Sequence, residues 1–451
     1  MNRLIALFLT TAAVFAADKK TALDRYVAKP DPAYEYHLVR TVKARGVTAY
    51  ILDMTSQKYL TKKEVNRPLW KHWVIITKPA KVEHRTGLLF IGGGSNGGNA
   101  PKSPSGEMMQ IALATRSVVV ELKMVPNQPL IFAGEKRERS EDAIIAYTWD
   151  KYLMAGDEKW PLRLPMTKAA VRAMDTVTDF LKSEEGGGLK VDKFVVAGGS
   201  KRGWTTWSTA AVDKRVVAIV PIVIDMLNVV PSFRHHKSAY GRYSNAVQDY
   251  VDMNIMEWMA KPEFAKLKLI EDPYEYRDRL TMPKFLLNSC GDQFFLPDSW
   301  QFYWKDLKGP KHIRYVPNTG HGLKDSDALH SLVAFYHAIL YKKKLPRYKW
   351  NVAADGTITA RAQDKPTEVR LWQATNPEAR NFRIDELGPK WKSTVLRPGQ
   401  NGAYTARPAA PPKGWTAYMI ELTFPGKVRP YKFTSGVVVT PKTLPFVERP
   451  N

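Results

Sequence analysis

The stretch Phe194-Val195-Val196-Ala197-Gly198-Gly199-Ser200-Lys201-Arg202-Gly203-Trp204 decides the fold. It predicts a buried strand that runs through a tight turn at Ser200 into a helix, which is typical of the nucleophile elbow of serine hydrolases. Small residues suit this turn because it is strained, exposes the serine hydroxyl and places the next backbone N–H beside a developing oxyanion. The usual pattern is G-x-S-x-G, but here Arg202 takes the second glycine's place and Gly203 follows one position late.

A second serine competes for the role of nucleophile. Gly93-Gly94-Ser95-Asn96-Gly97 matches G-x-S-x-G literally and follows a predicted strand. The segment after it, Gly98 to Pro104, contains two prolines and does not predict a helix directly after the serine. Without that helix no elbow forms, so a better role for this loop is to hold an oxyanion. We expect backbone N–H groups of Gly94 and Ser95 to act there together with that of Lys201.

An acid and a base follow the elbow in chain order. Asp292 comes just after a predicted strand at 284–288, and His321 lies on a Gly-flanked loop after a strand at 313–316. The order Ser, Asp, His, with each residue at a strand end, is that of the α/β-hydrolase triad. The sequence therefore predicts Ser200, Asp292 and His321 as the catalytic residues, with Asp298 as the alternative acid.

The surrounding chain predicts an α/β fold with a second, β-rich unit. Strand-like and helix-like segments alternate from about residue 70 to 344, which favours a doubly wound sheet. The expected helices include 140–154, 167–182, 299–307 and 325–341. We expect an α/β-hydrolase domain over 17–345, helical lid insertions at about 127–165 and 226–280, and a β-sandwich-like domain over 346–451. Within the second insertion, 245–260 has the amphipathic pattern of a helix.

Several polar residues of the second insertion are candidates for contact with substrate. Arg234, His235, His236 and Arg242 are expected to face it and hint at an anionic group. The spacing of the two histidines matches no metal site. Cys290, the single cysteine, is expected to be a buried inert thiol. We expect neither a metal nor a cofactor.

Charge and the N-terminus suggest a compartment and a partner. The chain has 68 basic and 44 acidic residues, a formal net charge of +24. Residues 1–16 have the positive start, apolar stretch and small-residue cleavage site of a signal peptide, so we expect a periplasmic or secreted protein with no membrane span after its removal. Export and the lack of nucleic-acid-binding motifs argue against nucleic acid as the acidic partner. An anionic envelope polymer remains a candidate.

These motifs resemble the PhoPQ-activated pathogenicity-related family. The resemblance covers about residues 25–440 and rests on Gly92–Asn96, Ala197–Trp204, Asp292–Ser299 and Pro377–Arg383. It implies a secreted α/β-hydrolase core and leaves the substrate open. The Gly-Gly-Ser turn is also similar to that of prolyl-oligopeptidase-type peptidases, and the late glycine to that of glucuronoyl esterases.

The sequence as a whole predicts a secreted serine hydrolase that cleaves an ester or an amide (peptide) bond. Its substrate would be a small molecule, a peptide or an acylated polymer. Two alternatives stay open, a non-catalytic binding or signalling protein on a hydrolase scaffold and a polysaccharide-directed esterase.

Overall fold

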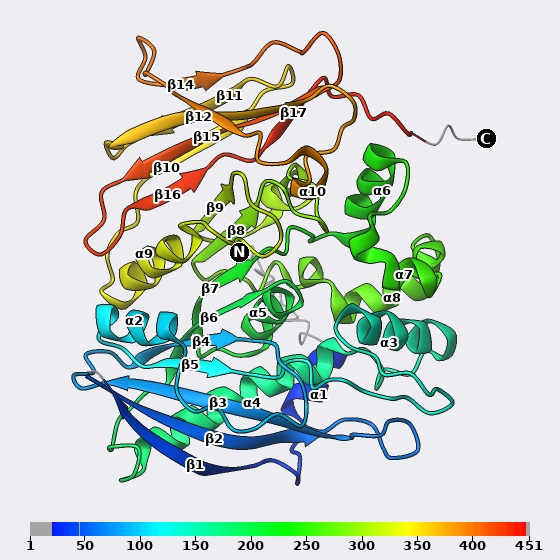
Figure 1. Ribbon diagram of the computed structural model, residues 1–451, viewed down its shortest axis with the longest axis vertical. Helices are drawn as coiled ribbons and strands as arrows, with labels where there is room; N and C mark the ends of the chain where they lie inside the picture. Colours follow the sequence, from blue (N-terminus) through cyan, green and yellow to red (C-terminus); the bar gives the residue numbers. More distant parts are fainter. Residues whose placement is uncertain (1–19, 45, 448–451) are drawn as a thin grey trace, which may run out of the picture.

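A nine-stranded sheet forms the centre of the protein in the computed structural model, which describes residues 20–44 and 46–447 (Figure 1). The predicted signal peptide, 1–16, lies outside the described residues. The spatial order of the strands is β1-β2-β3-β5-β4-β6-β7-β8-β9. Strands β5, β4, β6, β7, β8 and β9 run parallel to one another, whereas β1, β2 and β3 are joined antiparallel at one side. The bounds of the nine strands are β1 Glu35–Ala44, β2 Val47–Lys58, β3 Leu69–Pro79, β4 Thr86–Ile91, β5 Val119–Leu122, β6 Lys193–Gly199, β7 Val216–Ile222, β8 Lys284–Ser289 and β9 Lys311–Val316.

Helices cover both faces of this sheet. The helices α2 (Gly106–Thr115) and α9 (Ala328–Leu340) pack on one face, and α1 (Ala22–Ala28), α4 (Arg163–Lys182) and α5 (Lys201–Val212) pack on the other. The central strands are apolar on both sides for this reason, and all six residues of β8 are buried. Two separate apolar cores result, one on each face.

Two insertions form a helical group beside the carboxyl ends of the parallel strands (Figure 1). The first contains α3 (Asp142–Ala155), and the second contains α6 (Val229–Tyr240), α7 (Gln248–Asp252) and α8 (Pro262–Glu271). Helix α3 packs on α7 and α8, so the two insertions meet each other.

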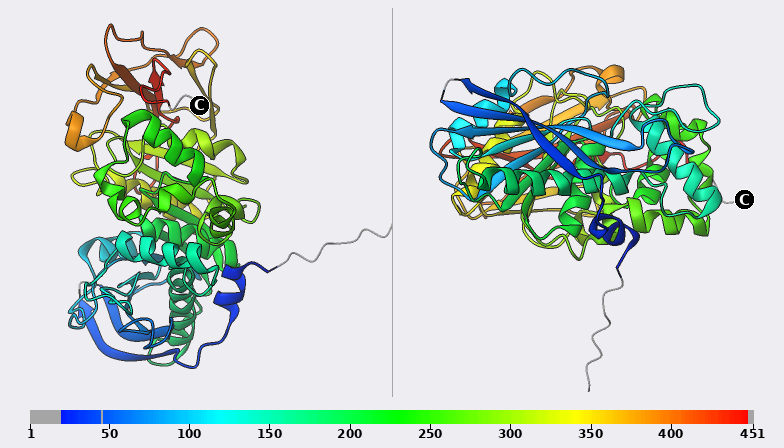
Figure 2. Two further views of the ribbon diagram at one scale, coloured as in Figure 1. Left: turned by 90° about the vertical axis from the view of Figure 1, so that its right-hand side faces the viewer. Right: turned by 90° about the horizontal axis from the view of Figure 1, so that it is seen from below.

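Antiparallel sheets of the C-terminal region stack on one end of the molecule (Figure 2). One sheet has the order β10-β11-β14, and the other has the order β13-β12-β15-β16 with β17 paired to β15. The short helix α10 (Ile384–Leu387) lies between β12 and β13. The bounds of these strands are β10 Tyr348–Val352, β11 Ile358–Ala362, β12 Glu368–Asn376, β13 Lys392–Val395, β14 Tyr404–Ala406, β15 Trp415–Phe424, β16 Tyr431–Thr434 and β17 Val438–Thr440.

The fold class predicted from the sequence, a doubly wound α/β-hydrolase sheet with helical insertions and a β-sandwich-like C-terminal part, is confirmed, with the C-terminal part built from antiparallel sheets. Two predicted helices are wrong. Residues 299–307 form two 3₁₀ turns, Ser299–Phe302 and Trp304–Asp306, because Trp300 and Trp304 pack on Trp350 of the C-terminal region. Residues 245–260 do not form one helix: the short helix α7 lies between two 3₁₀ turns, Asn245–Val247 and Ile255–Trp258, with Asn254 in the left-handed region at φ 53°.

Among residues 20–44 and 46–447, no helix has both the length and the apolar character needed to cross a membrane.

Candidate active site

Ser200 lies on the predicted turn between β6 and α5. Its backbone has φ 57° and ψ −127°, a strained conformation for a residue with a side chain. The strain is held by the sheet on one side, where the Ser200 N–H donates to the Ile222 carbonyl at 2.8 Å, and by the first turn of α5 on the other. Ser200 is partly exposed, whereas the strand that leads to it is buried.

Glycines before and after the serine allow the close packing of this turn. A Cβ on Gly198 would lie 2.8 Å from the Arg202 carbonyl oxygen, and one on Gly203 would lie 2.9 Å from those of Gly198 and Ile222. The close approach that excludes a side chain therefore falls at Gly203. Gly203, one position later than the second glycine of the usual pattern, therefore provides the space that the elbow needs in this chain.

Asp292 and His321 are in direct contact. The His321 Nδ1 lies 3.0 Å from Oδ1 and 2.9 Å from Oδ2 of Asp292. Asp292 is buried, and its Oδ1 also accepts the backbone N–H groups of Phe294 at 2.8 Å and Phe295 at 3.3 Å. These bonds fix the carboxylate, which in turn fixes the imidazole ring with its proton on Nδ1.

The other imidazole nitrogen, Nε2 of His321, is buried and has no hydrogen-bond partner among the described residues. Among the described residues no hydrogen bond joins it to Ser200. The ring packs on Phe294 with 4.3 Å between ring centroids, and the His321 N–H donates to Oε1 of Gln293 at 2.8 Å. Gln293 was not predicted as a site residue, although it directly follows Asp292 in the sequence.

Backbone N–H groups at the predicted oxyanion positions are unpaired. Those of Lys201, Gly94 and Ser95 make no hydrogen bond within the described part of the chain. Lys201 is the first residue of α5, where an N–H has no intrahelical partner and the helix dipole favours negative charge. Ser95 lies exposed on a loop, and the next helix, α2, begins only at Gly106.

Arg202 connects the elbow to the loop that carries Gly94. Its Nε donates to the Val125 carbonyl at 2.5 Å, and its two terminal nitrogens bind both carboxylate oxygens of Glu141 at 2.7 and 2.5 Å. A Cβ on Gly93 would lie 2.7 Å from the same guanidinium. The residue that replaces the usual glycine thus braces the site.

Glu141 receives both basic side chains of the elbow. Lys201 Nζ lies 2.8 Å from its Oε2, opposite Arg202. Partial burial raises the pKa of Glu141, but the Arg202 hydrogen bonds and the two positive charges outweigh it and lower the pKa to about 2. The residue precedes α3 with φ 54° and ψ −124°. Glu141 was not predicted from the sequence, because no motif near residue 141 indicates that it pairs with residues about 60 positions later in the chain.

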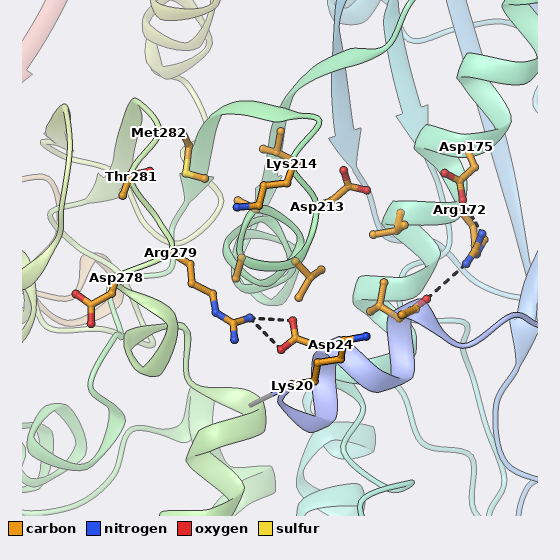
Figure 3. Close-up of a pocket in the computed structure, with 17 residues that line it drawn as sticks. Lys20, Asp24, Arg172, Asp175, Asp213, Lys214, Asp278, Arg279, Thr281 and Met282 are labelled. Carbon is orange, nitrogen blue, oxygen red and sulfur yellow. Dashed lines mark hydrogen bonds and ion pairs between the residues drawn. The ribbon is translucent and has the colours of Figure 1, made fainter. Parts of the chain in front are cut away.

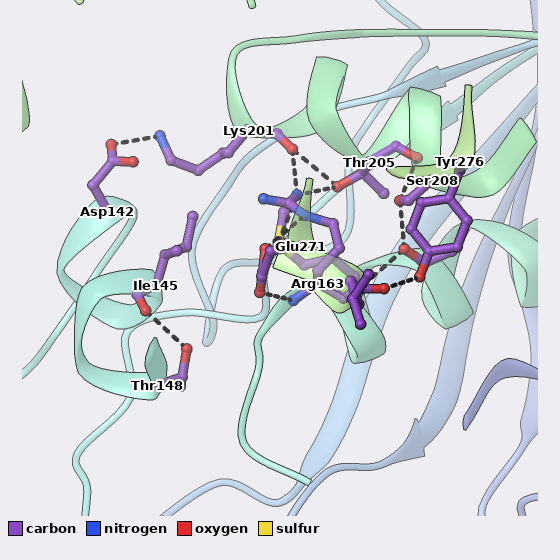
Figure 4. Close-up of polar contacts among 12 residues, drawn as sticks. Asp142, Ile145, Thr148, Arg163, Lys201, Thr205, Ser208, Glu271 and Tyr276 are labelled. Atoms are coloured by element: carbon purple, nitrogen blue, oxygen red, sulfur yellow. Dashed lines mark hydrogen bonds and ion pairs between the residues drawn. The ribbon is translucent and has the colours of Figure 1, made fainter. Parts of the chain in front are cut away.

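A buried polar network supports α5 from below (Figure 4). Arg163, fully buried, donates to the Lys201 carbonyl at 2.8 Å and to Thr205 Oγ1 at 3.0 Å, and pairs with Glu271 at 3.3 Å. Lys201 reaches Asp142 at 3.0 Å. Since Asp142 and Glu271 come from different insertions, both insertions are anchored to the first turn of the helix that carries the serine.

Asp298, the alternative acid, is occupied elsewhere. Its carboxylate lies 3.0 Å from His235 Nε2 through both oxygens and 2.6 Å from Arg380 Nη2. Burial opposes ionisation, but the charges of Arg380 and His235 hold the pKa of Asp298 far below its usual range. The structure therefore places Asp292, and not Asp298, against His321.

The four candidate substrate-facing residues of the second insertion do not form one group. His235 is held by Asp298, and His236 is buried and accepts the Ser244 N–H on Nε2 at 3.0 Å. Burial lowers the pKa of His236 to about 3, so it stays neutral. Arg234 and Arg242 are exposed.

A second buried carboxyl lies behind the site. Asp225 follows β7, and its oxygens accept hydrogen bonds from Tyr303 and, at 2.6 Å, from Tyr315. Burial, with a further contribution from the nearby charge of Asp292, raises its pKa to about 8. Asp225 was not predicted, although an acid just past a strand between those of Ser200 and Asp292 is a signal that could have been used.

The C-terminal region contacts the loops of the acid and the base. The Ile384 N–H donates to the Gly291 carbonyl at 3.0 Å. Asn318 and Trp391 exchange two hydrogen bonds of 3.0 and 2.9 Å. Arg380 belongs to the same segment, so residues 380–391 form part of the wall behind Asp292 and His321.

A cavity of about 930 Å³ is lined by Asp213 and Lys214 (Figure 3), which follow the end of α5 opposite Ser200. A helix of 12 residues separates the two places by about 18 Å. The cavity is lined by charged residues of both signs, several of them paired, such as Arg279 with Asp24 at 2.8 and 3.0 Å. We do not assign the reaction to it.

No cluster of three or more metal-ligating side chains occurs in residues 20–44 and 46–447. Cys290 is buried next to Asp292 in sequence, and burial raises the pKa of its thiol well above the usual value.

The strand order and the turn at Ser200 define an α/β-hydrolase-like scaffold. Residues 23–383 match the sequence profile of the PhoPQ-activated pathogenicity-related proteins, and the chain belongs to this family. It is 37% identical over 478 residues to autocrine proliferation repressor protein A of Dictyostelium discoideum, covering 99% of this chain and 95% of that protein.

Solved structures with a similar fold include enzymes of two kinds. Acetyl xylan esterase 1 of Thermoanaerobacterium is 16% identical, with a TM-score of 0.48 over 71% of this chain and 92% of that one. The acylaminoacyl peptidase of Pyrococcus horikoshii is 15% identical, with a TM-score of 0.42 over 69% of this chain and 50% of that one.

Proposed function

We propose that this protein is an exported serine hydrolase that cleaves an ester or amide bond through Ser200, His321 and Asp292. The observation that carries the proposal is the Asp292–His321 contact of 2.9 and 3.0 Å, together with the strained Ser200 at the start of α5. The unpaired N–H groups of Lys201, Gly94 and Ser95 support an oxyanion hole.

The reaction would proceed in two steps. Ser200 Oγ attacks the carbonyl carbon while His321 Nε2 takes its proton, and the leaving group departs with that proton as the acyl-serine forms. Water then attacks the acyl-serine, passes a proton to His321 and releases the acid, and Ser200 regains its proton. Asp292 stabilises the imidazolium throughout.

The test is covalent labelling with a fluorophosphonate probe, in which Ser200 Oγ displaces fluoride from phosphorus. Ser200→Ala should abolish labelling of the full-length protein and keep its unfolding transition. Ser95→Ala tests the serine of the literal G-x-S-x-G sequence: it removes that hydroxyl but keeps the backbone N–H proposed for the oxyanion hole, so labelling should persist. Labelling that persists in Ser200→Ala would overturn the assignment.

A non-catalytic signalling role is the second candidate. It is favoured by the sequence relationship to a protein named as an autocrine proliferation repressor, with 37% identity over nearly the whole of both chains. A folded wild-type protein that the probe does not label would support this role instead.

A further inference from the structure

A groove of about 460 Å³ opens beside the loop proposed to bind the oxyanion. Its lining includes Trp73 of β3 and Gly97 and Gly98 of that loop. The Trp73 carbonyl accepts the N–H of Lys123, the residue just after β5, at 2.9 Å. The groove is therefore at the same edge of the sheet as Ser200, three strands away in the order β3-β5-β4-β6 (Figure 1), or roughly 14 Å at ~4.8 Å per strand.

The charge of this groove is positive. Lys62, Arg67 and Lys71 line it, against one carboxylate, Asp53. Lys71 is 3.5 Å from Asp53, but Lys62 and Arg67 are exposed and form no ion pair within the described residues. Two positive charges are thus free to meet an anion in the groove.

Hydrogen-bond donors and an apolar surface accompany these charges. The backbone N–H groups of Gly97 and Gly98 have no hydrogen-bond partner in the part of the chain that the structure describes. Nothing lies within 4 Å of where a Cβ of Gly97 would be, so the loop opens to free space. Trp73 is partly exposed, and Leu69 on the same strand is 46% exposed. The groove therefore offers a flat apolar surface beside its donors and cations.

We propose that this groove binds an acidic sugar unit, so that the substrate is an acyl group carried by an acidic polysaccharide. A uronate presents a carboxylate to Lys62 and Arg67, hydroxyls to the loop, and an apolar ring face to Trp73. An extended peptide fits less well, because the carbonyls of β3 that strand addition would use beside the groove are occupied: Trp73 O accepts the Lys123 N–H at 2.9 Å, and Lys71 O accepts the Asn127 side-chain amide at 2.5 Å. The substrate role of the groove rests on the proposed function at Ser200.

The experiment measures binding without catalysis, in the Ser200→Ala protein, by titration calorimetry with a hexagalacturonate. The double variant Lys62→Ala/Arg67→Ala should weaken binding by about tenfold and reduce its salt dependence. The control is Lys392→Ala/Arg397→Ala, which also removes one exposed lysine and one exposed arginine but lies in the C-terminal region. It should change the affinity by less than about twofold. Trp73→Ala should weaken binding as well, and Trp73→Phe should restore part of it.

Three results would overturn the proposal. One is that the groove variant binds hexagalacturonate like its parent, and another is that the control loses as much affinity as the groove variant. The third is that hexaglutamate binds as tightly and depends on the same two cations, which would indicate an acidic peptide. Since all measurements use a protein without Ser200, failure here is separate from failure of the labelling test.

Discussion

Replacing either of two buried aspartates by asparagine should separate catalysis from stability. In Asp292→Asn, the side-chain oxygen is expected to stay at the position of Oδ1, where it accepts two backbone N–H groups at 2.8 and 3.3 Å. The amide nitrogen then lies about where Oδ2 was, 2.9 Å from His321 Nδ1. The retained oxygen still lies 3.0 Å from Nδ1, but the amide donor beside it opposes the Nδ1 proton and favours the tautomer with its proton on Nε2, the nitrogen that must accept the proton of Ser200.

The expected cost of this wrong tautomer is about 10³–10⁴ in rate. The second-order rate of fluorophosphonate labelling reports it, because labelling requires the activated serine and no knowledge of the natural substrate. Stability should change little in Asp292→Asn, since the two backbone hydrogen bonds remain.

Asp298→Asn should show the opposite pattern. Asp298 is 4% exposed and meets two side chains, the buried Arg380 at 2.6 Å and the partly buried His235 at 3.0 Å. Removing one partner from a buried ion pair costs about 3–5 kcal/mol. We expect urea unfolding to shift accordingly, while the folded variant labels within about tenfold of the wild type. Loss of labelling in Asp298→Asn with retention in Asp292→Asn would refute the assignment of the acid.

Three further substitutions test the support of the site and its pH dependence. Gly203→Ala should destabilise the protein by about 1–3 kcal/mol in urea unfolding, since its Cβ would meet two carbonyl oxygens at 2.9 Å; an unchanged midpoint would contradict this packing. Glu141→Gln should slow labelling by about tenfold to a hundredfold through misplacement of Arg202 and the elbow, and a rate equal to that of the wild type would show that the brace does not position Ser200. Asp225 has its pKa raised to about 8, so the folded protein holds a proton that the unfolded chain releases above about pH 4. The free energy of unfolding should therefore fall as pH rises from about 4 to 8, and Asp225→Asn should make this fall smaller. A wild-type free energy of unfolding that is the same at pH 5 and pH 8, measured with urea, would be evidence against a buried neutral carboxyl.

The parts of the fold predicted from the sequence are those with a local cause. The elbow follows from a short run in which an apolar strand, two glycines and a helix-forming segment are consecutive, and each parallel strand is apolar on both faces because helices cover both. The helix expected at 299–307 failed because Trp300 and Trp304 pack on Trp350, about 50 residues away in the chain. A contact between residues so far apart in the chain cannot be predicted from the local sequence pattern.

The same division holds for the site. The residues proposed for the reaction lie at strand ends and were identifiable one at a time. Their supports come from other parts of the chain: Glu141 and Arg163 from the first insertion, Glu271 from the second and Arg380 from the C-terminal region. A single sequence gives no measure of which distant charges pair, so these contacts required the structure.

The C-terminal region is best understood as part of the same structural unit as the central sheet. A boundary near residue 345 separates the sheets, yet the family match continues to residue 383, past β12 and through the segment that contains Arg380. That arginine binds Asp298, six residues after Asp292, and the next residues reach Gly291 and Asn318 on the acid and base loops. A core that ended at 345 would leave the buried Asp298 carboxylate without its arginine and both loops without this wall. The extent of the family match therefore agrees with the physical extent of the proposed active site, which includes the start of the C-terminal sheets.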